Sequence, residues 1–194
     1  MKILIAEDES DIARSYKLAL EERGHSVVLT SDGEDCLIKY HDEWLRTRHD
    51  QDSDQIGIET TYDINNDHPF HAIILDYKMP KMNGLEVAKQ ILAINPHQRI
   101  IFASAYVKET LEISTRHLPT ELMQKPFDEQ ALIDKVEDAN IYSELKKLGV
   151  DADALKAVNP PHETIKQLLD SIRRLKENLE LRNDDDLFQE RNNA

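Results

Sequence analysis

The chain has 194 residues, of which 40% are hydrophobic, and its formal net charge is −14 at pH 7. This hydrophobic content is enough to build a folded core, so a chain that is disordered throughout is excluded. The excess of acidic residues would repel phosphate backbones, which argues against direct binding of nucleic acid.

Strands and helices alternate along the first part of the chain. Short apolar runs predict five strands, at Lys2–Ala6, Ser26–Thr30, His71–Leu75, Arg99–Ser104 and Glu121–Lys125. Helical spacing and helix-end signals predict helices at Ser10–Arg23, Asp32 to about Arg48, Leu85–Ile94, Val107–His117 and Asp128 to about Tyr142. This alternation predicts an α/β fold with a doubly wound, five-stranded parallel sheet in the order 2-1-3-4-5.

The polar segment from Thr47 to Pro69 is too long for an ordinary helix-to-strand connection, which takes about 2 to 6 residues. We interpret residues 47–69 as an inserted acidic loop. A helix-to-strand connection lies at the edge of the sheet opposite the carboxyl ends of the strands, so the insertion should not shape a site at those ends.

No strand is predicted after about Tyr142. We therefore expect two parts, residues 1–142 and a helical extension at residues 143–194. The extension ends with a predicted helix, 162–182, whose apolar residues have heptad spacing: Ile165, Leu168, Ile172, Leu175 and Leu179. Two interpretations stay open. This helix either forms a homodimer or docks a partner protein, or it packs on the chain's own fifth helix.

Polar side chains stand where four of the predicted strands end: Glu7 and Asp8, Asp76, Ser104, and Lys125. In a sheet of this order these strand ends border one crevice. Three carboxylates in one place repel each other unless a cation joins them, and Mg²⁺ prefers such oxygen ligands. Lys125 and Ser104 could then reach phosphoryl oxygens. The set predicts that Asp76 attacks phosphorus while Mg²⁺ and Lys125 neutralise the developing charge.

Residues 1 to about 142 resemble a response-regulator receiver domain of two-component signalling. The resemblance is carried by Glu7-Asp8, by the run LDYKMPKMNG from Leu75 to Gly84, by Ser104-Ala105 and by Lys125-Pro126-Phe127, in this order and at these strand positions. It implies a flavodoxin-like fold and a signalling protein that is not an enzyme beyond its own phosphorylation and slow dephosphorylation.

The resemblance also implies roles for individual residues. Asp76 would accept a phosphoryl group from a sensor histidine kinase or a phosphotransfer protein in a Mg²⁺-dependent reaction. Lys78 would contribute its backbone carbonyl as a metal ligand beside Glu7, Asp8 and Asp76. Ser104 would be the switch residue, whereas Leu122 stands where the family often has an aromatic switch partner. The sequence therefore does not predict signal transmission through an aromatic ring at this position.

Two other functions compete with a switch that controls protein–protein contacts. A DNA-binding regulator would have to use the basic cluster Arg173, Arg174 and Lys176, which neighbouring acidic residues dilute. A phosphatase of the haloacid-dehalogenase type needs a second carboxylate two positions after the nucleophile, where this chain has Lys78. No run of about 20 apolar residues predicts a membrane span, so we expect a cytoplasmic protein without membrane contact. The single cysteine, Cys36, should be a packed thiol.

Overall fold

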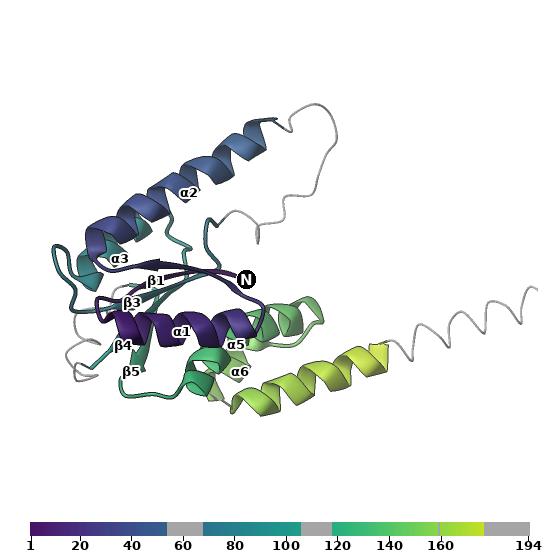
Figure 1. Ribbon diagram of the computed structural model, residues 1–194. Coiled ribbons are helices and arrows are strands. Elements are labelled where there is room, and N and C mark those ends of the chain that lie inside the picture. The colour runs from purple at the N-terminus through teal and green to yellow at the C-terminus, as the bar shows by residue number, and fades with distance from the viewer. Residues whose placement is uncertain (54–67, 106–117, 159, 177–194) are drawn as a thin grey trace, which may run out of the picture. The chain divides into compact units, whose positions relative to one another are not determined.

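The structure is a computed structural model that describes residues 1–53, 68–105, 118–158 and 160–176 (Figure 1). It divides into two compact units, unit 1 at Met1–Ile133 and unit 2 at Asp134–Ala194. None of the helices in the described ranges is both long and apolar enough to cross a membrane.

Unit 1 is built on a five-stranded parallel sheet in the order β2-β1-β3-β4-β5, as predicted (Figure 1). Its strands are β1 (Lys2–Ala6), β2 (Ser26–Thr30), β3 (Ala72–Asp76), β4 (Ile100–Ser104) and β5 (Thr120–Gln124). Every residue of β3 and β4 is buried. Strands that are covered on both faces need apolar side chains in both directions, which explains the unbroken apolar runs in the sequence.

Helix α1 (Ser10–Glu22) lies on one face of the sheet, and α2 (Gly33–Ser53) and α3 (Gly84–Ile94) lie on the other (Figure 1). The core between the sheet and the helices α2 and α3 includes Cys36 and Tyr40 from α2 and Val87 and Ile91 from α3, all fully buried. Gly24 ends α1 with a φ of 80°, the left-handed conformation that glycine adopts without strain.

Helix α2 is longer than predicted. The sequence placed its end near Arg48 and assigned Thr47 onward to a loop, but the helix continues to Ser53. The prediction was wrong for these residues because polar residues without Gly or Pro do not stop a helix by themselves. The rest of the 47–69 insertion up to residue 67, and the predicted helix Val107–His117, lie outside the described residues.

Unit 2 takes in most of α5 (Glu129–Lys147), together with α6 (Ala152–Val158) and a helix at residues 162–176. The end predicted for the fifth helix near Tyr142 is too early, since the apolar face continues through Leu145 and the helix stops before Gly149, whose φ is 85°. The predicted boundary between residues 142 and 143 therefore falls inside a helix.

The heptad-spaced stripe is partly used inside unit 2. Ile165 is buried, and Leu168 and Ile172 pack against the same cluster, which contains Ile141, Tyr142 and Leu145. Leu175 is 63% exposed. Leu179 lies outside the described residues. The front of the stripe thus packs on α5, which was one of the two predicted interpretations.

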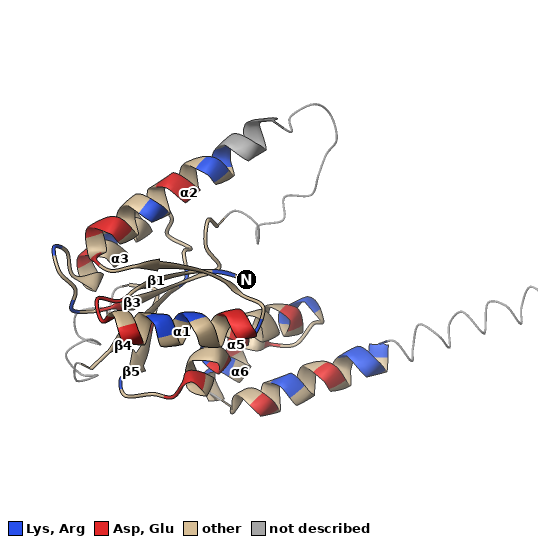
Figure 2. Ribbon diagram, viewed as in Figure 1, with Lys and Arg blue, Asp and Glu red and all other residues tan. Residues whose placement is uncertain are grey.

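Acidic and basic residues both occur along the helix 162–176 (Figure 2). Arg173, from the cluster that a DNA-binding function would need, is paired with Glu144 and lies 3.9 Å from Asp170. At the start of the same helix, His162 Nδ1 is 2.6 Å from Asp138 Oδ1. In the described part of unit 2, this helix presents no uniformly basic face.

Candidate functional site: an acidic cluster with a buried lysine

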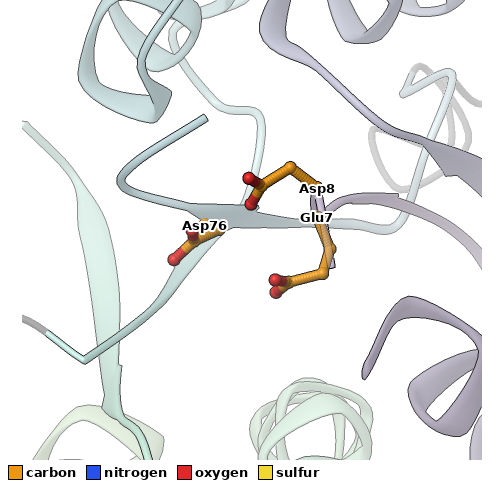
Figure 3. A group of neighbouring side chains, drawn as sticks. All are labelled: Glu7, Asp8 and Asp76. Carbon is orange, nitrogen blue, oxygen red and sulfur yellow. The ribbon is translucent and has the colours of Figure 1, made fainter. Parts of the chain in front are cut away.

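Three carboxylates gather at the carboxyl edge of the sheet because β1 and β3 are parallel neighbours. The register pairs Ala6 with Leu75, so Glu7 and Asp8, which follow β1, come level with Asp76 at the end of β3. Each of the three acids offers a carboxylate oxygen, and these oxygens all lie within 4.8 Å of one another (Figure 3). The prediction that these three side chains meet is confirmed.

Two of the three carboxylates are buried, with Glu7 only 2% and Asp76 only 8% exposed, whereas Asp8 is exposed. Burial raises the pKa of Glu7 above its usual range, against the lowering influence of Lys125. Burial likewise raises the pKa of Asp76, although the Lys125 charge lowers it. The site therefore holds negative charge where water cannot stabilise it well, and a cation beside these groups is favoured.

Lys125 supplies one positive charge to this cluster. It directly follows β5, and its Nζ donates a hydrogen bond to Glu7 Oε2 at 2.6 Å and lies 3.6 Å from Asp76 Oδ1. Its backbone N–H donates to the carbonyl of Ser104 at 2.8 Å, and the Lys125–Pro126 peptide bond is cis. The ring of Phe127, two residues on, stacks on Tyr16 of α1 with a centroid distance of 5.4 Å.

Ser104 is the last residue of β4 and is 1% exposed. The register places Asp76 beside Ala103, so Ser104 stands one residue beyond the level of Asp76 on the neighbouring strand. Leu122 is in the middle of β5, opposite Phe102, and packs against the core of unit 1. Ser104 therefore lies at the edge that carries the acids, and Leu122 lies deeper in the sheet.

The donor set fits a hard divalent cation. Glu7 Oε1 is a buried oxygen without a hydrogen-bond partner in the described part of the structure. Such an atom is costly unless something binds it, and Mg²⁺ binds carboxylate oxygens of this kind while keeping some of its waters. Lys78 lies in the loop directly after Asp76, and its role as a ligand through the backbone carbonyl stays a prediction.

One ion pair at this edge of the sheet was not predicted from the sequence. Lys81, in the loop between β3 and α3, lies 2.7 Å from Asp32, which precedes α2. The two residues are 49 positions apart. Only the folded topology brings them together, and no local motif in the sequence pointed to the pair.

Comparisons with known proteins agree with this geometry. Residues 56–137 match the family model for the response regulator receiver domain. The response regulator receiver protein CpdR of Brucella abortus is 25% identical over 137 residues, which cover 70% of this chain and 93% of CpdR. The transcriptional regulatory protein DltR of Streptococcus agalactiae is 28% identical over 70% of this chain, but the match spans only 50% of DltR.

Among solved structures, the response regulator TrrA of Thermotoga maritima, in complex with Mg²⁺ and BeF, is 26% identical with a TM-score of 0.52. The match covers 71% of this chain and 96% of TrrA. The parallel sheet, the strand-end acids and these relatives agree: residues 56–137 match the receiver domain of response regulators, and this chain is similar to response-regulator receiver proteins over about 70% of its length.

Proposed function

We propose that this protein is a phosphorylation-controlled response regulator in which Asp76 accepts a phosphoryl group from the phosphohistidine of a sensor histidine kinase or phosphotransfer protein. The observation that carries the proposal is the cluster of Glu7, Asp8 and Asp76, in which Glu7 and Asp76 are buried and both lie close to the Lys125 ammonium. Among the described residues, the buried Glu7 Oε1 has no hydrogen-bond partner, and an ion-pair network with a purely structural role would not require such an atom.

Mg²⁺ is the cofactor that suits this donor set. Glu7, Asp8 and Asp76 would hold it together with the backbone carbonyl of Lys78. When bound, the ion supplies positive charge to the phosphoryl oxygens and to the carboxylates around it. The similar protein TrrA was solved in complex with Mg²⁺, which supports the choice of metal.

The chain's own residues account for the transfer. A carboxylate oxygen of Asp76 forms the new O–P bond while the N–P bond to the donor histidine breaks and its electron pair returns to the imidazole nitrogen. Lys125 Nζ, already 3.6 Å from Asp76 Oδ1, is placed to bind a phosphoryl oxygen. The Ser104 hydroxyl would donate to another phosphoryl oxygen. Later hydrolysis of the acyl phosphate restores the Asp76 carboxylate.

The output is a change in protein–protein contacts. Ser104 would move toward the phosphoryl group. This movement would favour one of two conformations of the protein, which differ in how the surface next to Ser104 is packed. Because Leu122 lies against the core and carries no aromatic ring, the signal would not pass through an aromatic switch on β5. The exposed Leu175 and the residues after it are the segment through which the chain would form a homodimer or bind an effector.

A phosphodonor experiment tests this function. The full chain is incubated with a small acyl phosphate, with Mg²⁺ in one sample and with a chelator in the other. We expect labelling only with Mg²⁺, and release of the label by hydroxylamine, as an acyl phosphate requires. Labelling that is independent of divalent cations, or that resists hydroxylamine, would contradict an aspartyl phosphate at this cluster.

A further inference from the structure

An ion pair ties together two loops at the edge of the sheet that carries the acidic cluster. Lys81 Nζ lies 2.7 Å from Asp32 Oδ2 and 4.0 Å from Glu34 Oε2. The Asp32 side chain is 11% exposed and that of Lys81 is 54% exposed. The carboxylate is therefore held in the protein, and the lysine reaches it from the loop 77–83, which connects β3 to α3.

Asp32 is a fixed anchor for this lysine. Its Oδ1 accepts a hydrogen bond from the backbone N–H of Asp35 at 2.9 Å, and its carbonyl accepts one from the N–H of Cys36 at 3.1 Å. These two bonds cap the start of α2. The lysine therefore binds a carboxylate whose other oxygen is already committed to the backbone.

The loop 77–83 is pressed against α2 at the same place. A Cβ on Gly33 would lie 2.3 Å from the carbonyl oxygen of Met82, so only glycine allows this approach of the two backbones. Lys81 itself has a φ of 63°, a left-handed conformation that non-glycine residues keep only where surrounding contacts impose it. The conformation of the loop thus depends on its contacts with the start of α2.

We propose that Asp32 and Lys81 are positioning residues of the Mg²⁺ site, because their ion pair fixes the loop that carries Lys78 between Asp76 and the start of α3. The inference rests on the proposed function and deepens it. Neither residue would touch the ion. They would act by holding the Lys78 backbone carbonyl at the place where it completes the donor set of Glu7, Asp8 and Asp76.

Two substitutions distinguish a role in positioning the loop from a direct electrostatic effect of the two charges on Mg²⁺ binding. Asp32→Asn keeps an oxygen that can cap α2 and removes only the charge. Lys81→Asn removes the opposite charge and introduces a residue that tolerates a positive φ. A field effect on a dication would weaken binding in the first variant and strengthen it in the second. Loss of a positioning contact weakens binding in both.

The test is a calorimetric titration of the full chain with Mg²⁺, followed by acyl-phosphate labelling over a range of Mg²⁺ concentrations. We expect both variants to bind Mg²⁺ about twofold to fivefold more weakly, the range for a partly exposed ion pair. The Mg²⁺ concentration for half-maximal labelling should rise, while the rate at saturating Mg²⁺ stays at the wild-type value. Lys81→Arg, which keeps the charge, should bind Mg²⁺ with wild-type affinity.

Glu34→Gln is the matched control, because it removes a carboxylate 4.0 Å from the same lysine and leaves the 2.7 Å pair intact. It should bind Mg²⁺ as the wild type does. Wild-type affinity in both Asn variants, or shifts in opposite directions, would overturn the positioning role while leaving the proposed function standing. A wild-type chain that binds no Mg²⁺ and takes no label would overturn both.

Discussion

Lys125 is the residue whose loss should disturb the site most directly. Its side chain is 13% exposed and its partner Glu7 only 1%, so Lys125→Met leaves a buried carboxylate without its counter-charge. We expect the free energy of unfolding without Mg²⁺ to fall by about 3 kcal/mol at neutral pH, as when one partner of a buried pair is removed. Urea unfolding of the variant and of Lys17→Met, which loses an exposed lysine, measures the difference.

The loss in Lys125→Met should depend on pH in a definite direction. Burial already raises the pKa of Glu7 in the wild type, and without Lys125 this pKa rises further. The folded variant then binds more protons than the unfolded chain, so its stability increases as the pH falls through the folded pKa of Glu7. The deficit should be smaller at pH 5 than at pH 8. An equal deficit at both pH values would contradict a charged, uncompensated Glu7.

Cys36 provides a second residue-scale prediction. It is fully buried in the core of unit 1, and burial raises the pKa of its thiol to about 12. Because the thiolate is the reactive form, the native protein should not react with a disulfide reagent at pH 8, and the urea-unfolded chain should react fully. Rapid labelling of the native protein would show that α2 does not pack as described.

The residues of the acidic cluster could be predicted because each stands at a strand end. The order 2-1-3-4-5 then brings Glu7, Asp8 and Asp76 to one edge without any knowledge of distances. Lys81 could not be assigned in this way, because its contact with Asp32 depends on a left-handed backbone and on a close approach of two loops. Local sequence carries little information on either feature.

At the scale of elements, the start of α3 packs directly against the end of β3. Gly84 is buried, and a Cβ there would lie 2.2 Å from the carbonyl oxygen of Asp76, a backbone atom that cannot turn aside. Gly84→Ala should therefore lower the free energy of unfolding by about 1–3 kcal/mol, as overpacking does. It should also slow labelling of Asp76, because the strand end must move.

The control for Gly84→Ala is Glu86→Ala, an exposed substitution in the same turn of α3, which should change stability by less than about 0.5 kcal/mol. Thermal unfolding and labelling rates of the two variants are compared. A Gly84→Ala protein that is as stable as wild type and labels at the same rate would show that α3 can shift away from β3 without cost.

Element ends were harder to predict than element types. All five strands were predicted within one residue of their ends. The signal was clearest for β3 and β4, because buried parallel strands are continuous apolar runs bounded by polar residues. Helices α2 and α5 both run further than predicted, since their last turns contain no residue that stops a helix. Helix ends that depend on tertiary contacts, and not on Gly or Pro, leave a weak signal in the sequence.

At the scale of the whole molecule, the apolar stripe of the helix 162–176 has a buried part, which packs within the chain, and an exposed part, which could contact a second chain. Ile165 is 1% exposed and Leu175 is 63% exposed. Ile165→Ala should destabilise unit 2 by about 2–4 kcal/mol, and Leu175→Ala should cost less than about 0.5 kcal/mol if the chain is a monomer. If Leu175 belongs to a dimer seam, its substitution should lower the mass measured by light scattering.

The Mg²⁺ affinity of Ile165→Ala tests whether a substitution in unit 2 affects the metal ligands in unit 1. The acids Glu7, Asp8 and Asp76 all lie in unit 1, and Ile165 lies in unit 2. We therefore expect Ile165→Ala to bind Mg²⁺ with the affinity of the wild type. A change of more than about twofold would mean that unit 2 helps to orient the metal ligands, as residues behind a ligand do in other metal sites.

Phosphorylation of Asp76→Asn is the most direct test of the central claim. The substitution keeps the size of the side chain and removes the nucleophilic carboxylate. Asp128→Asn is a matched control, because Asp128 Oδ1 caps α5 by accepting a hydrogen bond from the N–H of Ala131, which asparagine can also do. With an acyl phosphate and Mg²⁺, we predict wild-type labelling of Asp128→Asn and no labelling of Asp76→Asn. Undiminished labelling of Asp76→Asn would contradict the assignment of Asp76 as the phosphoacceptor.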